Sequence, residues 1–122
     1  MANEGLNQQQ VLELIVKTLD TKKAEDIKVI RIGDLSILAD YFVIADGLSS
    51  TQTRALADEV EFQLKQNGIT PDQVQGANGS DWIIIDCRDI VIHVFSKTQR
   101  DFYNLERLWK DGEMIDISSW LV

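Results

Sequence analysis

Two apolar runs that stand three residues apart constrain the fold of this chain most strongly. The first covers residues 82–86 and the second 90–95, and Cys87-Arg88-Asp89 separates them. This spacing predicts a β-hairpin. Both runs are apolar at nearly every position, which is typical of strands that are covered on both faces. Helices can cover one face of the hairpin. The sequence does not show what covers the other face.

The segments around the hairpin alternate between helical and strand patterns. Leu12, Ile15, Val16 and Leu19 recur at the spacing of one helical face, which predicts an amphipathic helix within 6–21. We expect strands at 26–32 and 41–44, a short strand near 73–77, and two further helices that begin after Ser49 and Ser96 and end at Asn67-Gly68 and Asp111-Gly112. Helices that interleave with strands predict an α/β fold with a mixed β-sheet flanked by helices.

The length of 122 residues fits one domain with one core. No repeat or Pro/Gly-rich linker divides the chain, so we expect a single domain over 1–122, with its core at about 6–110. The tail, 111–122, carries Ile115, Ile117, Trp120 and Leu121. It either packs back onto the domain or completes an interface.

The charge of the chain bears on its partners. Twenty acidic residues against 12 basic ones give a net charge of −8, which disfavours direct binding of nucleic acid. Residues 34–61 hold six acids and one base, Arg54. This segment is either a solvated face that aids solubility or an acidic surface that steers toward a basic protein, and composition does not decide between the two.

The sequence also indicates a compartment. Cys87 is the one cysteine, so no intrachain disulfide can form, which fits a reducing compartment. The first ten residues show no export signal, and no apolar run approaches the roughly 20 residues that span a bilayer. We expect a cytoplasmic protein that does not contact a membrane.

Few residues could carry catalysis. One histidine and one cysteine exclude a four-ligand zinc site of the Cys/His kind, and no cofactor motif is present. Gly47 and Ser49 could hold a phosphate at a helix start, although Ser49 and Gln52 also have the spacing of a capping box. Asp86 and Asp89 form either a metal-binding carboxylate pair or the ends of a turn. The alternative function is therefore a nucleotide-binding or nucleotidyl-transferring enzyme that uses Gly47, Ser49, Asp86 and Asp89.

Two aromatic side chains of the hairpin are candidates for binding. His93 is in phase with Val91 and Phe95, which is more typical of a core or interface histidine than of a catalytic base. Trp82 begins a strand after a polar loop at 78–81, where large aromatic residues frequently anchor partners. Core packing is the other interpretation of Trp82.

An ordered set of segments resembles the Iojap-like family of ribosomal silencing factors. The matching residues run over about 6–110: Ala24, Asp26-Ile27, Asp40-Tyr41-Phe42-Val43-Ile44, Gly47, Ser49, Gln52, Gln75-Gly76, Trp82-Ile83-Ile84-Ile85-Asp86, Val91-Ile92-His93-Val94-Phe95, Arg100, and Phe102-Tyr103-Asn104-Leu105-Glu106-Arg107-Leu108-Trp109. The chain departs from the family pattern at Gln75, where Glu is frequent, at Cys87, where an aromatic is frequent, and at Asp46, where Ser or Thr is frequent.

The resemblance implies a nucleotidyltransferase-like fold without catalytic residues, which needs no cofactor or metal. It implies binding to the fourteenth protein of the large ribosomal subunit, on the face that meets the small subunit. Such binding blocks subunit joining and represses translation when nutrients are short. A homodimer of the free protein is also implied. We place the partner-facing surface, as a hypothesis, at Trp82, Asp86, His93, Phe95, Lys97 and Tyr103.

Overall fold

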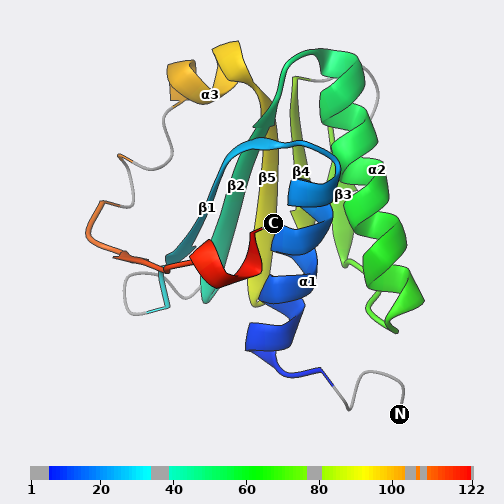
Figure 1. Cartoon of the computed structure of the whole chain (residues 1–122), viewed down its shortest axis with the longest axis vertical. Coiled ribbons are helices and arrows are strands. Elements are labelled where there is room, and N and C mark those ends of the chain that lie inside the picture. Colours follow the sequence, from blue (N-terminus) through cyan, green and yellow to red (C-terminus); the bar gives the residue numbers. More distant parts are fainter. Residues whose placement is uncertain (1–5, 34–38, 77–80, 104–106, 108–109, 122) are drawn as a thin grey trace.

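The computed structural model describes residues 6–33, 39–76, 81–103, 107 and 110–121 (Figure 1). The elements in chain order are α1 (Gln8–Thr21), β1 (Glu25–Arg31), β2 (Tyr41–Gly47), α2 (Ser50–Gln66), β3 (Gln73–Gln75), β4 (Trp82–Asp86), β5 (Ile90–Ser96), α3 (Lys97–Tyr103), β6 (Glu113–Met114) and the 3-10 turn η2 (Ser118–Trp120). The hairpin, the short strand near residue 73 and the first two helices are confirmed.

The six strands form one mixed sheet in the order β3-β4-β5-β2-β1-β6. The central pair, β2 and β5, is parallel, and each of the other neighbouring pairs is antiparallel. The parallel pair needs a long crossover, which α2, β3 and β4 supply. The predicted α/β class with a mixed sheet is therefore confirmed.

Helices α1 and α2 cover one face of the sheet, which we call the helix face (Figure 1). The periodic residues of α1 are all buried, and the α2 residues Leu56, Val60 and Leu64 pack with them against the sheet. The side chain of Asn7 caps α1 by accepting from the backbone N–H of Gln10. Gly68 follows α2 with φ of 81°, as expected for a glycine that ends a helix.

A second apolar cluster lies on the other face of the sheet, where side chains from β1, β2 and their neighbouring residues meet side chains of the hairpin. Its buried members are Ile30, Ile32, Ala39, Phe42, Ile44 and Phe95, and the partly buried Trp82 and Val91 pack against them. Both faces of the hairpin thus carry packed side chains, which explains why its two runs are apolar at nearly every position. We call this side of the sheet the aromatic face.

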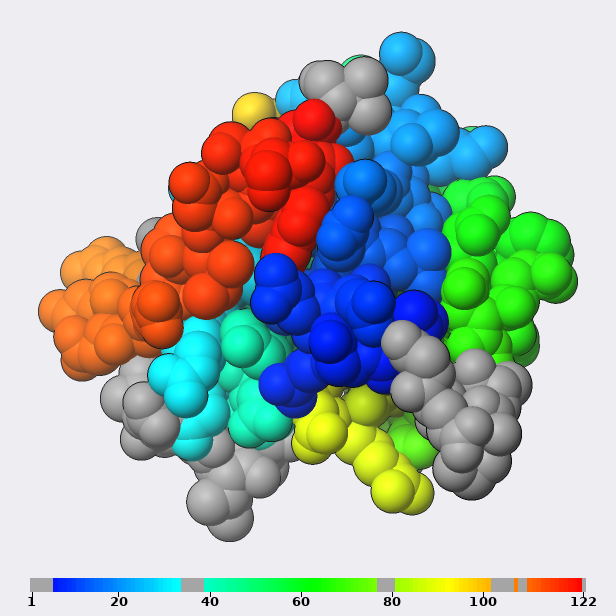
Figure 2. All heavy atoms as spheres, turned by 60° about the horizontal axis from the view of Figure 1, so that its bottom comes forward, coloured from blue at the N-terminus to red at the C-terminus, as the bar shows by residue number. Residues whose placement is uncertain are grey.

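The C-terminal segment packs back onto the domain. Strand β6 pairs with β1, and Ile117 and Trp120 are buried in the helix-face core. Figure 2 shows this segment, in red, side by side with α1, in blue. Of the two alternatives for the tail, the structure therefore shows packing onto the domain.

Two sequence predictions differ from the structure in detail. Strand β2 runs on to Gly47, three residues beyond the predicted strand at 41–44. Ser49 caps α2 by accepting from Gln52 N–H, but the side chain of Gln52 accepts from Leu48 N–H and not from the cap residue. The third helix, α3, begins after Ser96 as predicted, and residues 104–106 and 108–109, which were predicted to continue it, lie outside the described residues.

Within the described part of the chain, no helix is both long and apolar enough to cross a membrane.

Candidate functional site

The aromatic face brings three of the predicted site residues together. Trp82 pairs with Phe95 across the antiparallel β4–β5 ladder, and their rings stack with centroids 4.9 Å apart. His93 stands two positions before Phe95 on β5, so the two side chains lie on the same face of the sheet. Phe42 joins from the parallel strand β2, with its ring edge-on to His93 at 4.6 Å. We call Phe42, Trp82, His93 and Phe95 the aromatic cluster.

A hydrogen bond orders the cluster internally. The indole Nε1–H of Trp82 donates to Nδ1 of His93 at 3.1 Å. His93 is only 6% exposed, and its burial lowers the pKa of the imidazole to about 4, so the ring is neutral near pH 7. Phe95 is fully buried, whereas Trp82 remains partly exposed. Of the four rings, Trp82 is therefore the one with an accessible surface.

The other predicted site residues lie around the cluster rather than in it. Asp86 shares the aromatic face but ends β4, about 13 Å from Trp82 at the usual rise of a strand. Its Oδ1 accepts from the backbone N–H of Arg88. Lys97 is exposed at the first position of α3. Tyr103 ends α3, and its side chain lies outside the described part of the structure.

A buried ion pair, which the sequence did not reveal, fixes α3 to the sheet. Nη1 of Arg100 donates to Oδ1 of Asp46 at 2.8 Å, and both side chains are about 95% buried, with exposures of 5% and 4%. Arg100 also donates to the backbone carbonyl of Asp26 and lies 3.4 Å from its carboxylate. Burial raises the pKa of Asp46, and Arg100 partly offsets this. Arg100 thus ties α3 to the ends of β1 and β2.

The structure contradicts the alternative nucleotide site. Gly47 pairs with Ser96 at one end of the sheet, and Asp86 pairs with Val91 near the other end of β5. The five-residue offset along β5 corresponds to about 17 Å. Asp89 lies in the turn beyond Asp86. These residues cannot surround one phosphate group, because the strand directions place them at opposite ends of the sheet.

Gly47 has a packing role instead. A Cβ at this position would lie 3.0 Å from both the backbone nitrogen and the hydroxyl oxygen of Thr53. Replacing Gly47 with alanine is therefore expected to lower the free energy of unfolding by about 1–3 kcal/mol, measured by chemical denaturation. Gly33→Ala is the control, because the nearest atom there belongs to the Asp40 side chain, which can turn aside. An unchanged Gly47→Ala variant would contradict the close approach of α2 to β2.

The described residues offer no metal site, and the thiol of Cys87 is a weak nucleophile. Among them, no group of three His, Cys, Asp or Glu side chains could hold a metal ion. Burial raises the pKa of the Cys87 thiol to about 12, with smaller contributions from Asp86 and Asp72, so the reactive thiolate is suppressed.

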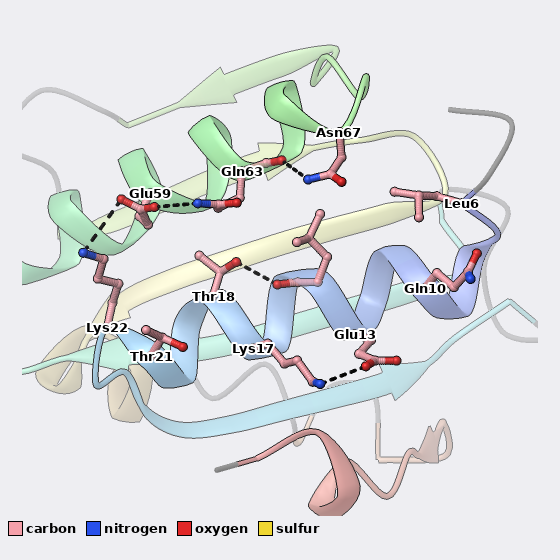
Figure 3. A pocket seen from close by; sticks show the side chains of 11 residues that line it. Leu6, Gln10, Glu13, Lys17, Thr18, Thr21, Lys22, Glu59, Gln63 and Asn67 are labelled. Atoms are coloured by element: carbon pink, nitrogen blue, oxygen red, sulfur yellow. Dashed lines mark hydrogen bonds and ion pairs between the residues drawn. The ribbon is translucent and has the colours of Figure 1, made fainter. Parts of the chain in front are cut away.

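A groove of about 500 Å³ lies between α1 and α2 (Figure 3). Its charged and polar side chains pair largely with one another. Lys17 lies 3.0 Å from Glu13, Lys22 lies 4.0 Å from Glu59, and Gln63 donates to Glu59 at 3.0 Å. The pairing leaves few polar groups that converge on a ligand, so the aromatic face is the stronger candidate site.

These features define a small α/β domain that has a partly exposed aromatic cluster and shows no catalytic constellation among its described residues. Comparison with known proteins identifies the family. A family model described as "Ribosomal silencing factor during starvation" matches residues 6–121, so the chain belongs to this family of non-enzymatic ribosome regulators. The resemblance found in the sequence is thereby confirmed.

Individual relatives agree with the family model. Ribosomal silencing factor RsfS of Bacillus subtilis is 38% identical over 112 residues, which cover 92% of this chain and 95% of the relative. A mouse protein, "Mitochondrial assembly of ribosomal large subunit protein 1", is 30% identical over 80% of this chain and 44% of its own length. A crystal structure of a Chromobacterium violaceum protein superposes with a TM-score of 0.84 at 29% identity and covers 93% of each chain.

Proposed function

We propose that this ribosomal silencing factor binds the fourteenth protein of the large ribosomal subunit, on the face that meets the small subunit. The bound protein then blocks subunit joining by steric occlusion and represses translation when nutrients are short. The description of its family names silencing during starvation, and the name of the mouse relative refers to the large ribosomal subunit. The family description supports silencing under nutrient limitation, and the name of the mouse relative supports the large subunit as the target.

The observation that carries the proposal is the position of Trp82. Its indole stacks on the fully buried Phe95 and bonds to the buried His93, so the ring is fixed from below while its outer surface stays accessible. An aromatic side chain that is rigid before binding loses little conformational entropy when a partner covers it. Trp82 is therefore the proposed anchor.

The remaining residues take different proposed roles. Phe95 and His93 support Trp82 from beneath, because both are buried. Asp86 accepts from a Lys or Arg of the partner through the oxygen that does not bind the Arg88 backbone. Lys97 and Tyr103 extend the contact at the start and end of α3.

Charge supports a basic protein as the partner. The chain carries a net charge of −8, and the exposed Asp81 lies beside Trp82 in the sequence. A negative surface accelerates encounter with a basic protein and selects against nucleic acid. The proposal therefore includes no recognition of nucleic-acid sequence. We also propose a cytoplasmic location and no membrane contact.

The scaffold completes the proposal. The domain over 1–122, with its core at about 6–110 and the short tail 111–122, has a nucleotidyltransferase-like fold that serves as a binding scaffold without catalysis or a cofactor. Free chains associate as a homodimer, which light scattering of the purified protein tests.

Association with the purified fourteenth protein of the large subunit tests the proposed partner. The association rate constant is expected to fall about tenfold when NaCl is raised from about 50 to about 500 mM, because salt screens attraction between opposite charges. Stopped-flow mixing or surface plasmon resonance measures the rate. A basic protein from the small subunit serves as the control for nonspecific attraction. Equal binding of both basic proteins, or no binding of the fourteenth protein, would contradict the proposal.

A further inference from the structure

We propose that His93 is a positioning residue, whose imidazole holds the indole of Trp82 in the orientation that receives the partner, without touching the partner itself. The proposal rests on the proposed function, in which Trp82 is the anchor. It assigns to His93 a role separate from the contact role that the sequence suggested.

The strand register places His93 where it can orient the indole. Trp82 pairs directly with Phe95, and Ile84 pairs with His93, so His93 lies diagonally across the ladder from Trp82. The indole can stack on Phe95, with 29° between the ring planes, while its N–H reaches Nδ1 of His93. Phe42 closes the side of the imidazole that faces β2. Stacking fixes the plane of the indole, and the hydrogen bond fixes its rotation within that plane.

The protonation state of His93 suits this role. Because Nδ1 accepts from Trp82, the single proton of the neutral ring resides on Nε2. The pKa of the buried imidazole is lowered to about 4, so Nδ1 remains an acceptor throughout the physiological pH range.

The second nitrogen of His93 argues against a role in stability. Nε2 is buried and has no hydrogen-bond partner among the residues that the structure describes, which is unfavourable for folding. An apolar side chain of similar size would avoid this unfavourable burial. The stability of the domain therefore does not account for a histidine at this position, whereas the acceptor that Nδ1 provides to Trp82 does.

Without this acceptor, the indole of Trp82 is expected to become more mobile. Trp82 is partly exposed, so its N–H can bond to water once the bond to His93 is lost. The ring would then sample other rotamers and would have to be reordered on binding, which weakens affinity. The loss of one such hydrogen bond corresponds to about a tenfold change in affinity.

Two substitutions separate positioning from structural support. His93→Leu removes the acceptor and fills the space with an apolar side chain, whereas His93→Asn keeps an oxygen close to the place of Nδ1. Nuclear magnetic resonance measures hydrogen exchange of the Trp82 indole N–H in the free protein, and Trp82→Phe assigns that resonance. Sedimentation with purified large ribosomal subunits measures affinity, and urea denaturation measures stability.

For His93→Leu, the positioning role predicts weaker binding without a loss of stability. His93→Leu is expected to speed indole exchange at least tenfold and to weaken binding about tenfold, while the urea midpoint stays unchanged or rises. His93→Asn is expected to retain slow exchange and to bind within about threefold of wild type. In the Trp82→Phe background, which has no indole donor, His93→Leu is expected to weaken binding no further.

Three outcomes would overturn the positioning role. The first is slow indole exchange in His93→Leu, and the second is wild-type affinity of that variant despite fast exchange. The third is an equal further loss of binding in the Trp82→Phe background, which would indicate direct contact between His93 and the partner. If the wild-type chain fails to bind large subunits, the proposed function fails. Indole exchange in the free variants then still decides whether His93 fixes Trp82.

Discussion

Replacing Arg100 with methionine is expected to lower the free energy of unfolding by about 3–5 kcal/mol at neutral pH. The substitution leaves the carboxylate of Asp46 buried at 3% exposure without its 2.8 Å partner. It also removes the bonds from Arg100 to Asp26, which hold α3 against the end of β1. Urea or thermal denaturation of the variant measures the loss.

Two further variants test the cause. Adding Asp46→Asn to Arg100→Met removes the stranded charge and is expected to recover a large part of the loss. Arg54→Met removes an arginine whose ion pair with Asp58 on α2 is exposed, and it is expected to change stability by less than about 1 kcal/mol. If Arg54→Met and Arg100→Met lowered the free energy of unfolding equally, burial of the Arg100–Asp46 pair would not be the cause of the loss.

The loss in Arg100→Met should depend on pH. Burial raises the folded-state pKa of Asp46, and in the variant no Arg100 opposes this. An acid whose pKa is raised by folding stabilises the folded state below its unfolded pKa, and that contribution is lost as pH rises through the folded pKa. The variant is therefore expected to lose stability relative to wild type as the pH rises from about 4 to about 7. A deficit that is independent of pH would contradict a stranded carboxylate.

Trp82→Ala is expected to weaken binding to purified large ribosomal subunits by at least about 30-fold, which corresponds to about 2 kcal/mol. The substitution removes the accessible ring that Phe95 and His93 hold in place. Sedimentation at several subunit concentrations measures the dissociation constant, and circular dichroism confirms that the variant is folded.

The matched control is Phe62→Ala. Phe62 is 54% exposed on α2, which covers the opposite face of the sheet, so the control also removes an exposed aromatic ring. It is expected to leave affinity within about twofold of wild type. If the folded Trp82→Ala variant bound as tightly as Phe62→Ala, Trp82 would not be the anchor and the interface would lie elsewhere.

Local sequence patterns were sufficient to predict most of the helices and strands. The period of Leu12 to Leu19 predicts α1 because helix burial depends on neighbours within two turns. The apolar runs of the hairpin indicate two packed faces because side chains alternate along a strand. The hypothesis that followed the family resemblance put Trp82, His93 and Phe95 on one surface, and the structure shows them on one face of the sheet.

Long-range pairings could not be predicted in this way. Phe42 meets His93 only because β2 lies parallel to β5, and no local pattern specifies that register. Arg100 and Asp46 are 54 positions apart, so their ion pair left no periodic signal. The two-residue strand β6 is too short for a period to be recognised. The alternative site failed for the same reason, since strand direction separates Gly47 from Asp86.

The structure shows that several acidic side chains of residues 34–61 form ion pairs within the chain. Asp46 is buried against Arg100, Asp58 pairs with Arg54, and Glu61 pairs with Lys65. Several acids of 34–61 therefore serve contacts within the chain, so the proposed steering depends on exposed acids such as Asp81, beside Trp82.

Subunit joining in a sucrose gradient tests silencing by steric occlusion most directly. Purified small and large subunits are mixed after the large subunits have been incubated with the chain, with Trp82→Ala and Phe62→Ala in parallel. Occlusion predicts that wild type and Phe62→Ala shift material from the joined ribosome to the free subunits, with the chain sedimenting with the large subunit, and that Trp82→Ala requires a much higher concentration. Undiminished joining with the chain bound to the large subunit would contradict steric occlusion.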